Sequence, residues 1–144
     1  MSSQVYEWLL KLVELRRDRS VARSRRAQQD FLRSKQFSDE LKGYSNEYDR
    51  QWQRTAAQGD SVLLLQTMAS FGGHLHSTSQ TQQQETTKLQ GSSEQALQQA
   101  LQDSRRAESL RNFMDRQKAQ RRLAAERREQ KALEDDLNAR PPRR

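Results

Sequence analysis

The sequence contains no cysteine, two prolines and five glycines in 144 residues, and only 32% of its residues are hydrophobic. The absence of cysteine excludes disulfide bonds, iron–sulfur clusters and thiolate nucleophiles. A globular domain is usually about 45–50% apolar, so this chain lacks the residues for a large three-dimensional core. Two paired helices need only a narrow apolar seam, and this composition is sufficient for one. We therefore expect an all-α chain.

Long hydrophobic segments are also missing from the sequence. No stretch approaches the roughly 18–20 consecutive apolar residues of a transmembrane helix. Residues 1–4 lack the basic and apolar regions that begin a secretory signal. We therefore expect a cytoplasmic protein.

Motifs of catalysis and cofactor binding are missing as well. No glycine-rich phosphate loop ends in Lys-Ser or Lys-Thr, so we predict no nucleotide hydrolysis by this chain. His74 and His76 are two positions apart, which places them on different faces of a helix and favours exposed polar residues over metal ligands. We predict no enzymatic activity, no cofactor and no metal.

The sequence is instead rich in helix-forming residues. Residues 1–58 contain one glycine and no proline and are dominated by Arg, Gln, Glu, Leu and Ala. Gly59 suits the left-handed position after a helix, Asp60 or Ser61 can cap the next helix, and Pro141-Pro142 cannot continue it. We predict a single coiled-coil domain over residues 1–144, with helices at about 3–57 and 62–139. The turn lies at about 58–61 and a basic tail at 140–144.

The position of the turn predicts the register of the hairpin. If the chain folds back at Gly59, residues whose numbers add to about 119 lie opposite each other. The opposite pairs are then Val5–Met114, Leu9–Leu110, Leu12–Ala107, Arg16–Asp103, Tyr44–Leu75 and Tyr48–Phe71. The spacing of Val5, Leu9 and Leu12 predicts the seam of the first helix, and it leaves Trp8 and Val13 partly exposed. The same spacing at residues 37, 41, 44 and 48 is offset by one residue, which predicts a discontinuity near residues 34–37. The second helix is longer and overhangs the first.

Residues 72–93 are the weakest helical segment, because they contain three glycines and many Ser, Thr and Gln. Each glycine costs a helix about 1 kcal/mol relative to alanine, so composition by itself predicts a loop or a frayed segment. A structureless loop of this length is unusual. The register places Phe71 and Leu75 on the face that meets the first helix, which favours a helix over residues 71–78 with Gly72-Gly73 as a kink.

Charge divides the chain into three segments. The net charge is +4 for residues 1–58, −3 for residues 59–104 and +6 for residues 105–144. The arginine runs indicate solvated helix faces, a surface for an acidic protein, or a nucleic-acid site. Nucleic-acid binding fits less well, because acidic residues are interspersed and no aromatic residue lies within either run. A membrane-surface helix near the N-terminus and a partly disordered Gln-rich adaptor are further alternatives.

Aromatic residues gather on either side of the predicted turn. Two interpretations are open for this cluster: packing in the seam, or a docking surface whose rings stay partly exposed. Both can hold for different rings. The cluster comprises Phe37, Tyr44, Tyr48, Trp52 and Phe71.

The layout resembles the FliJ family of flagellar type III export proteins, which are antiparallel two-helix coiled coils with a longer second helix. The resemblance covers most of the chain. It rests on Leu41-x-x-Tyr44-x-Asn46-Glu47-Tyr48, on Phe71-x-x-x-Leu75 after the turn, and on Glu129-Gln130-Lys131-Ala132-Leu133-Glu134 before the basic tail.

The resemblance implies a non-enzymatic stalk, similar to the gamma subunit of rotary ATPases. Such a stalk links the hexameric export ATPase to the cytoplasmic domain of the export gate protein FlhA, is peripherally associated with the inner membrane, and assists substrate and chaperone delivery. The equivalent stalk of a virulence injectisome is the nearest alternative. The implied gate-binding residues are Phe37, Leu41, Tyr44, Tyr48, Phe71, Leu75, Thr78 and Gln82. The implied ATPase-binding residues are Val5, Trp8, Leu12, Arg16, Arg121, Arg122, Arg127 and Arg128.

Overall fold

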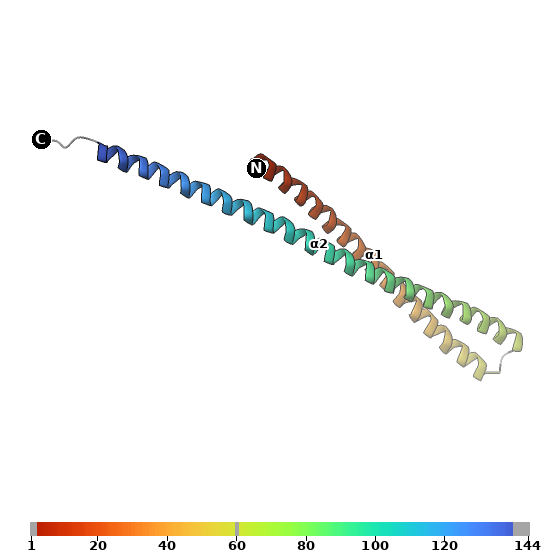
Figure 1. Cartoon of the computed structure of the whole chain (residues 1–144). Coiled ribbons are helices and arrows are strands. Elements are labelled where there is room, and N and C mark those ends of the chain that lie inside the picture. The colour runs from red at the N-terminus through yellow and green to blue at the C-terminus, as the bar shows by residue number, and fades with distance from the viewer. Residues whose placement is uncertain (1–2, 60, 140–144) are drawn as a thin grey trace. The chain divides into compact units, whose positions relative to one another are not determined.

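A computed structural model describes residues 3–59 and 61–139 of the chain. Over these residues it consists of two α-helices, α1 at Ser3–Ala57 and α2 at Val62–Ala139. The helices pack against each other as an antiparallel hairpin in which α2 is the longer helix (Figure 1). The predicted all-α hairpin is therefore confirmed. The basic tail and Pro141-Pro142 lie outside the described residues.

The turn between the helices forms at the predicted glycine. Gly59 has a φ of 74°, in the left-handed region that glycine adopts without steric cost. On the other side of the turn, the Leu64 backbone N–H donates to Ser61 Oγ at 3.3 Å. Ser61 therefore caps the start of α2 and satisfies one of its free amide groups. Asp60, the other residue predicted as a cap, lies outside the described residues.

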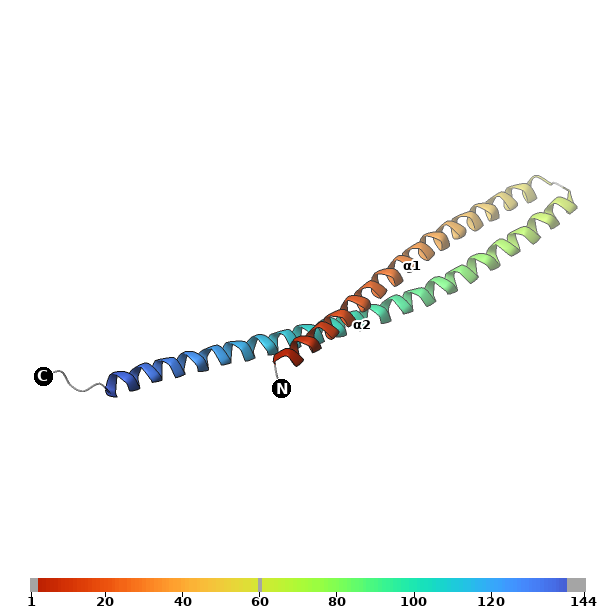
Figure 2. The ribbon, with the colours of Figure 1, turned by 90° about the horizontal axis from the view of Figure 1, so that it is seen from above.

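The chain divides into two compact units, each of which pairs a segment of α1 with a segment of α2. Unit 1 comprises residues 1–17 and 102–144, and unit 2 comprises residues 18–101 and contains the turn (Figure 2). The ring centroids of Tyr6 and Phe113 are 5.7 Å apart in unit 1, and those of Tyr48 and Phe71 are 5.0 Å apart in unit 2. The residue numbers of both pairs add to 119, so the predicted register is confirmed within each unit.

The seam of unit 1 uses a different face of α1 from the one that the sequence predicted. Tyr6, Leu10 and Val13 are half-buried, whereas Val5, Leu9 and Leu12 are exposed. On α2 the buried residues of this unit are Asp103, Ala107 and Met114. The predicted α1 seam was therefore wrong by one residue, and Val13 lies in the seam rather than outside it.

The seam of unit 2 is built largely from serine. Five of its buried residues are serines, namely Ser20, Ser34, Ser38, Ser45 and Ser79, and the sixth is Ala100. The α1 serines follow the spacing of a coiled-coil seam, in step with the half-buried Leu41 and Tyr48. This spacing continues without an offset through residues 34–37, so the predicted discontinuity was wrong. The apparent offset arose because Val5, Leu9 and Leu12 are one residue out of step with the true seam.

Helix α2 continues through residues 72–93, where composition by itself predicted a loop. The threonine hydroxyls of this segment bond within their own helix. Thr81 Oγ1 donates to the Ser77 carbonyl at 3.1 Å, Thr86 Oγ1 to the Gln82 carbonyl at 2.9 Å, and Thr87 Oγ1 to the Gln83 carbonyl at 3.0 Å. A hydroxyl that bonds to the carbonyl four residues earlier has its partner within the helix, although such bonds slightly destabilise a helix.

Candidate protein-interaction surfaces

The eight predicted gate-binding residues all belong to unit 2, but they divide between surface and seam. Three aromatic residues point largely into solvent: the exposed fraction is 51% for Phe37, 63% for Tyr44 and 56% for Phe71. Thr78 is also exposed. The remaining four are half-buried in the seam, namely Leu41, Tyr48, Leu75 and Gln82. The structure therefore places Tyr48 in the seam and leaves Phe37, Tyr44 and Phe71 exposed, and docking by the exposed rings stays a prediction.

Tyr48 connects the seam to the exposed part of this group. Its ring meets the Phe71 ring at an interplanar angle of 57° and also lies directly against Gly72. A methyl group on Gly72 would be 3.2 Å from Tyr48 Cε1, which is closer than ordinary van der Waals contact. Tyr48 thus packs against Phe71, and Gly72 provides the space for the tyrosine ring.

Gln82 uses its amide inside the hairpin. Its Nε2 donates to Ser34 Oγ at 3.0 Å, and Ser34 Oγ is also 2.7 Å from Thr86 Oγ1. Thr78 donates its hydroxyl to the His74 carbonyl at 2.9 Å, within its own helix. These polar groups are satisfied within the hairpin, so the exposed binding chemistry of the predicted set comes from its aromatic rings.

The predicted ATPase-binding residues all belong to unit 1. Val5, Trp8 and Leu12 lie on the outer face of α1, and Trp8 is 68% exposed. They are three or four positions apart, so they share one face of the helix. That face is not the seam face of Tyr6 and Leu10. The N-terminal segment of α1 therefore carries two apolar faces, one packed on α2 and one open to solvent.

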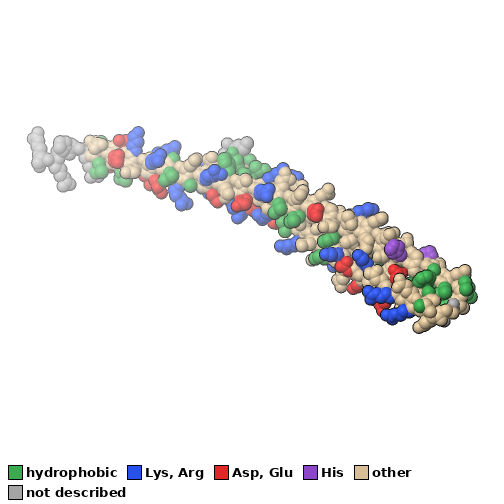
Figure 3. All heavy atoms as spheres, turned by 90° about the horizontal axis from the view of Figure 1, so that it is seen from below, with side chains coloured by type: hydrophobic (Ala, Val, Ile, Leu, Met, Phe, Trp, Pro, Cys, Tyr) green, Lys and Arg blue, Asp and Glu red, His purple; other side chains and the backbone are tan. Residues whose placement is uncertain are grey.

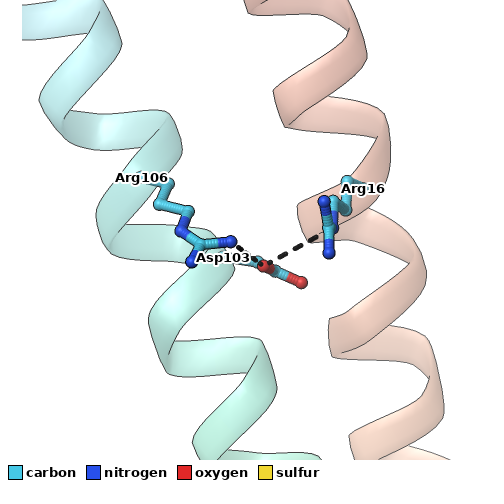
Figure 4. A network of polar contacts seen from close by, with 3 residues as sticks. All are labelled: Arg16, Asp103 and Arg106. Atoms are coloured by element: carbon cyan, nitrogen blue, oxygen red, sulfur yellow. Dashed lines mark ion pairs between the residues drawn. The ribbon is translucent and has the colours of Figure 1, made fainter.

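Arg16, at the end of this exposed face, is held by a buried carboxylate (Figure 4). Its Nε lies 3.8 Å from Asp103 Oδ1, and Arg106 Nη1 lies 3.9 Å from the same oxygen. The Asp103 side chain is 2% exposed, while the Arg16 side chain is 69% exposed. The carboxylate thus anchors two arginines from the seam and leaves their guanidinium groups accessible.

The other four predicted arginines lie toward the C-terminal end of α2. By the register, Ser3 lies opposite Arg116, and Arg121 still lines a pocket with Ser3, Tyr6 and Glu7 of α1. The overhang of α2 follows Arg121. All side chains from Lys118 to Ala139 are exposed. The four arginines are Arg121, Arg122, Arg127 and Arg128. Residues 118–139 contain six basic and five acidic residues, so this solvated helix has a mixed charge and its arginines stand among carboxylates.

Two contacts of unit 1 were not predicted from the sequence. One is the tilted ring pair Tyr6–Phe113. Its residue numbers add to 119, so a search for aromatic residues at opposite positions would have found it. The other is an ion pair in which Arg111 Nη2 donates to Glu14 Oε1 at 2.5 Å. Its numbers add to 125, so a strict comparison of opposite positions cannot find it.

The sequence model of one family, described as the flagellar FliJ protein, matches residues 3–144. The chain belongs to the FliJ family. No curated protein and no solved structure matches it closely enough to be compared. As a FliJ-family protein, the chain is a component of the flagellar type III export apparatus, and the family is not enzymatic. Within the described residues of this FliJ-family chain, neither helix contains a segment that is both long and apolar enough to cross a membrane.

Proposed function

We propose that this FliJ-family protein is a stalk-like coupling component of a flagellar type III export apparatus. Unit 2 would bind the cytoplasmic domain of the export gate protein FlhA, and unit 1 would bind the hexameric export ATPase. The protein would act in the cytoplasm, peripherally associated with the inner-membrane apparatus, and would assist delivery of substrates and chaperones. Each proposed surface lies within one compact unit, so each can be tested by substitutions in that unit.

The observation that carries this proposal is the exposure of aromatic rings on a narrow hairpin. Tyr44 and Phe71 present large apolar areas to solvent, and Tyr48 packs against the Phe71 ring. Aromatic residues contribute most of the binding energy in many interfaces, because they bury a large area at a small entropic cost. A few such residues are sufficient for a small and transient interface.

Binding of the FlhA cytoplasmic domain by the Tyr44→Ala variant tests the gate surface. We expect the affinity to fall at least tenfold while the thermal unfolding temperature stays unchanged, because Tyr44 is mostly exposed. Tyr48→Ala is a poor test, because Tyr48 packs in the seam. Leu32→Ala is the matched control, since Leu32 is a similarly exposed apolar residue of the same helix that was not predicted to bind the gate. Equal affinities of the Tyr44 and Leu32 variants would refute the site.

The proposal for the ATPase rests on two features of unit 1. The outer face of α1 offers Val5, Trp8 and Leu12, and the C-terminal end of α2 offers four exposed arginines. An apolar surface of the ATPase ring would bind the outer face of α1. Acidic groups of the ring would bind the arginines of α2. Burial of a mostly exposed tryptophan is worth about 1.5–3 kcal/mol, so Trp8 would supply much of the affinity.

Stimulation of the ATPase by two variants tests the second surface. Deletion of residues 119–144 removes the overhang and should abolish stimulation. The Arg127→Gln/Arg128→Gln variant keeps the helix and should weaken stimulation at low salt. At high salt the variant and the parent chain should differ less, because screening weakens the same attraction in the parent chain. If the deletion variant stimulates as well as the parent chain, the proposed role of the overhang is wrong.

A further inference from the structure

A groove of about 260 Å³ lies in unit 2, near the turn. Tyr48, Trp52, Met68 and Ala69 provide its apolar lining, Gly72 and Gly73 form the backbone of one side, and Asp49 and His76 stand beside it. Figure 3 shows hydrophobic side chains gathered next to the two histidines in this part of the molecule. The groove shares Tyr48 with the residues assigned above to the gate and has no residue in common with those assigned to the ATPase.

The first feature of the groove is its open wall at Gly73. Gly72 has a packing reason, because the Tyr48 ring occupies the space of its missing side chain. Gly73 has none: a methyl group at this position would meet no atom within 4 Å. Glycine in the middle of a helix costs about 1 kcal/mol relative to alanine. The effect of this costly residue is to keep one wall of the groove free of side chains.

The second feature of the groove is the combination of an aromatic lining with the carboxylate of Asp49. The indole of Trp52 is oriented by a 3.4 Å hydrogen bond from its Nε1 to the Leu65 carbonyl of the opposite helix. Asp49 forms no ion pair with any residue that the structure describes. A carboxylate next to indole and phenol rings attracts a cation, which gains from the negative charge and from the ring faces together. In a chain of net charge +7, a local site for a cation is unexpected.

We propose that this groove binds an arginine side chain presented by a peptide segment of a partner protein. A planar guanidinium can stack on Trp52 and bond to both oxygens of Asp49. An ammonium group is a compact charge that lacks the planar stacking and the two-pronged bond. The length of an arginine side chain also lets its methylene groups lie along Met68 and Ala69. The partner segment is therefore basic, in contrast to the acidic partner that the arginine-rich overhang would bind.

The groove is separate from the aromatic gate surface around α1. Tyr44 and Asp49 are five positions apart, which places them about 140° apart on a helix of 3.6 residues per turn. Neither Tyr44 nor Phe71 lines the groove. Tyr48 is the shared residue, since its ring contacts Phe71 and also borders Gly72. Two partners could therefore occupy unit 2 at the same time, one on each face.

The test selects peptides from a random displayed library on the full chain carrying Trp8→Phe, which leaves Trp52 as its only tryptophan. Peptides that also bind the Gly73→Leu variant are discarded, because a leucine at this position fills the groove. We expect the remaining peptides to share an arginine and to change the fluorescence of Trp52. Replacing that arginine by the neutral isostere citrulline, or Asp49 by asparagine, should weaken binding about tenfold.

Two control variants separate the groove from other effects. Gly91→Leu makes the same change at another exposed glycine of α2 with no atom within 4 Å, so it should bind the peptides like the parent chain. Tyr44→Ala should also bind them normally while it loses the gate. The proposal is overturned if no peptide survives the counter-selection, if the peptides lack a basic residue, or if citrulline binds equally well. It is also overturned if the chain associates with itself and Gly73→Leu disperses it, because the occupant is then a second copy.

Discussion

Replacement of the adjacent glycines of α2 by alanine should have opposite effects on stability. Both glycines lie inside the helix, so each substitution gains about 1 kcal/mol of helix propensity. At Gly73 nothing opposes this gain, because the added methyl group meets no atom within 4 Å. We therefore expect Gly73→Ala to raise the free energy of unfolding by about 1 kcal/mol. For a chain of this size that corresponds to a rise of about 3 °C in Tm.

At Gly72 the same methyl group would lie 3.2 Å from Cε1 and 3.3 Å from Cδ1 of Tyr48. The tyrosine ring must then move, and its contact with Phe71 restricts the movement. Overpacking of this kind costs about 1–3 kcal/mol, which cancels or exceeds the gain in propensity. Gly72→Ala should therefore be less stable than Gly73→Ala by about 1–3 kcal/mol.

Thermal and urea unfolding followed by far-ultraviolet circular dichroism measure both effects. Gly91→Ala serves as a reference, since this glycine is helical and open like Gly73. Gly73→Ala and Gly91→Ala should agree within about 0.5 kcal/mol, as expected for surface substitutions away from special features. If Gly72→Ala stabilises the chain as much as the other two variants, the Tyr48 ring does not pack on Gly72 and the reasoning is wrong.

Three further predictions concern polar contacts of the two units. Asp103→Ala should lower the free energy of unfolding by about 1 kcal/mol in urea titrations, because two arginines lose their carboxylate but remain solvated; a stabilised variant would contradict this. The ion pair of Glu14 with Arg111 should give a coupling below about 1 kcal/mol in a double-mutant cycle, and the coupling should vanish at high salt. Gln82→Ala should cost about 1 kcal/mol through its lost bond to Ser34, yet FlhA binding in pull-downs should stay unchanged.

The sequence by itself determined the topology of this protein. The positive φ of Gly59 and the cap by Ser61 follow from residue types whose local preferences need no tertiary partner. Once the turn is fixed, the register of an antiparallel hairpin is fixed with it. Tyr6–Phe113, Arg16–Asp103 and Tyr48–Phe71 all agree with the value of 119 that the turn predicts.

Only the tertiary structure decided which face of each helix packs. The sequence offered two stripes on α1 that differ by one residue. Hydrophobicity favoured the stripe that begins with Val5 over the stripe that begins with Tyr6. The packed stripe is the one in step with Leu41 and Tyr48, because all positions of a helix rotate together and the seam must close along its length. Much of that seam is serine, which hydrophobicity cannot identify as buried. The same rotation of α1 left Trp8 and Tyr44 exposed, and so it contributed to the surfaces that we propose for binding.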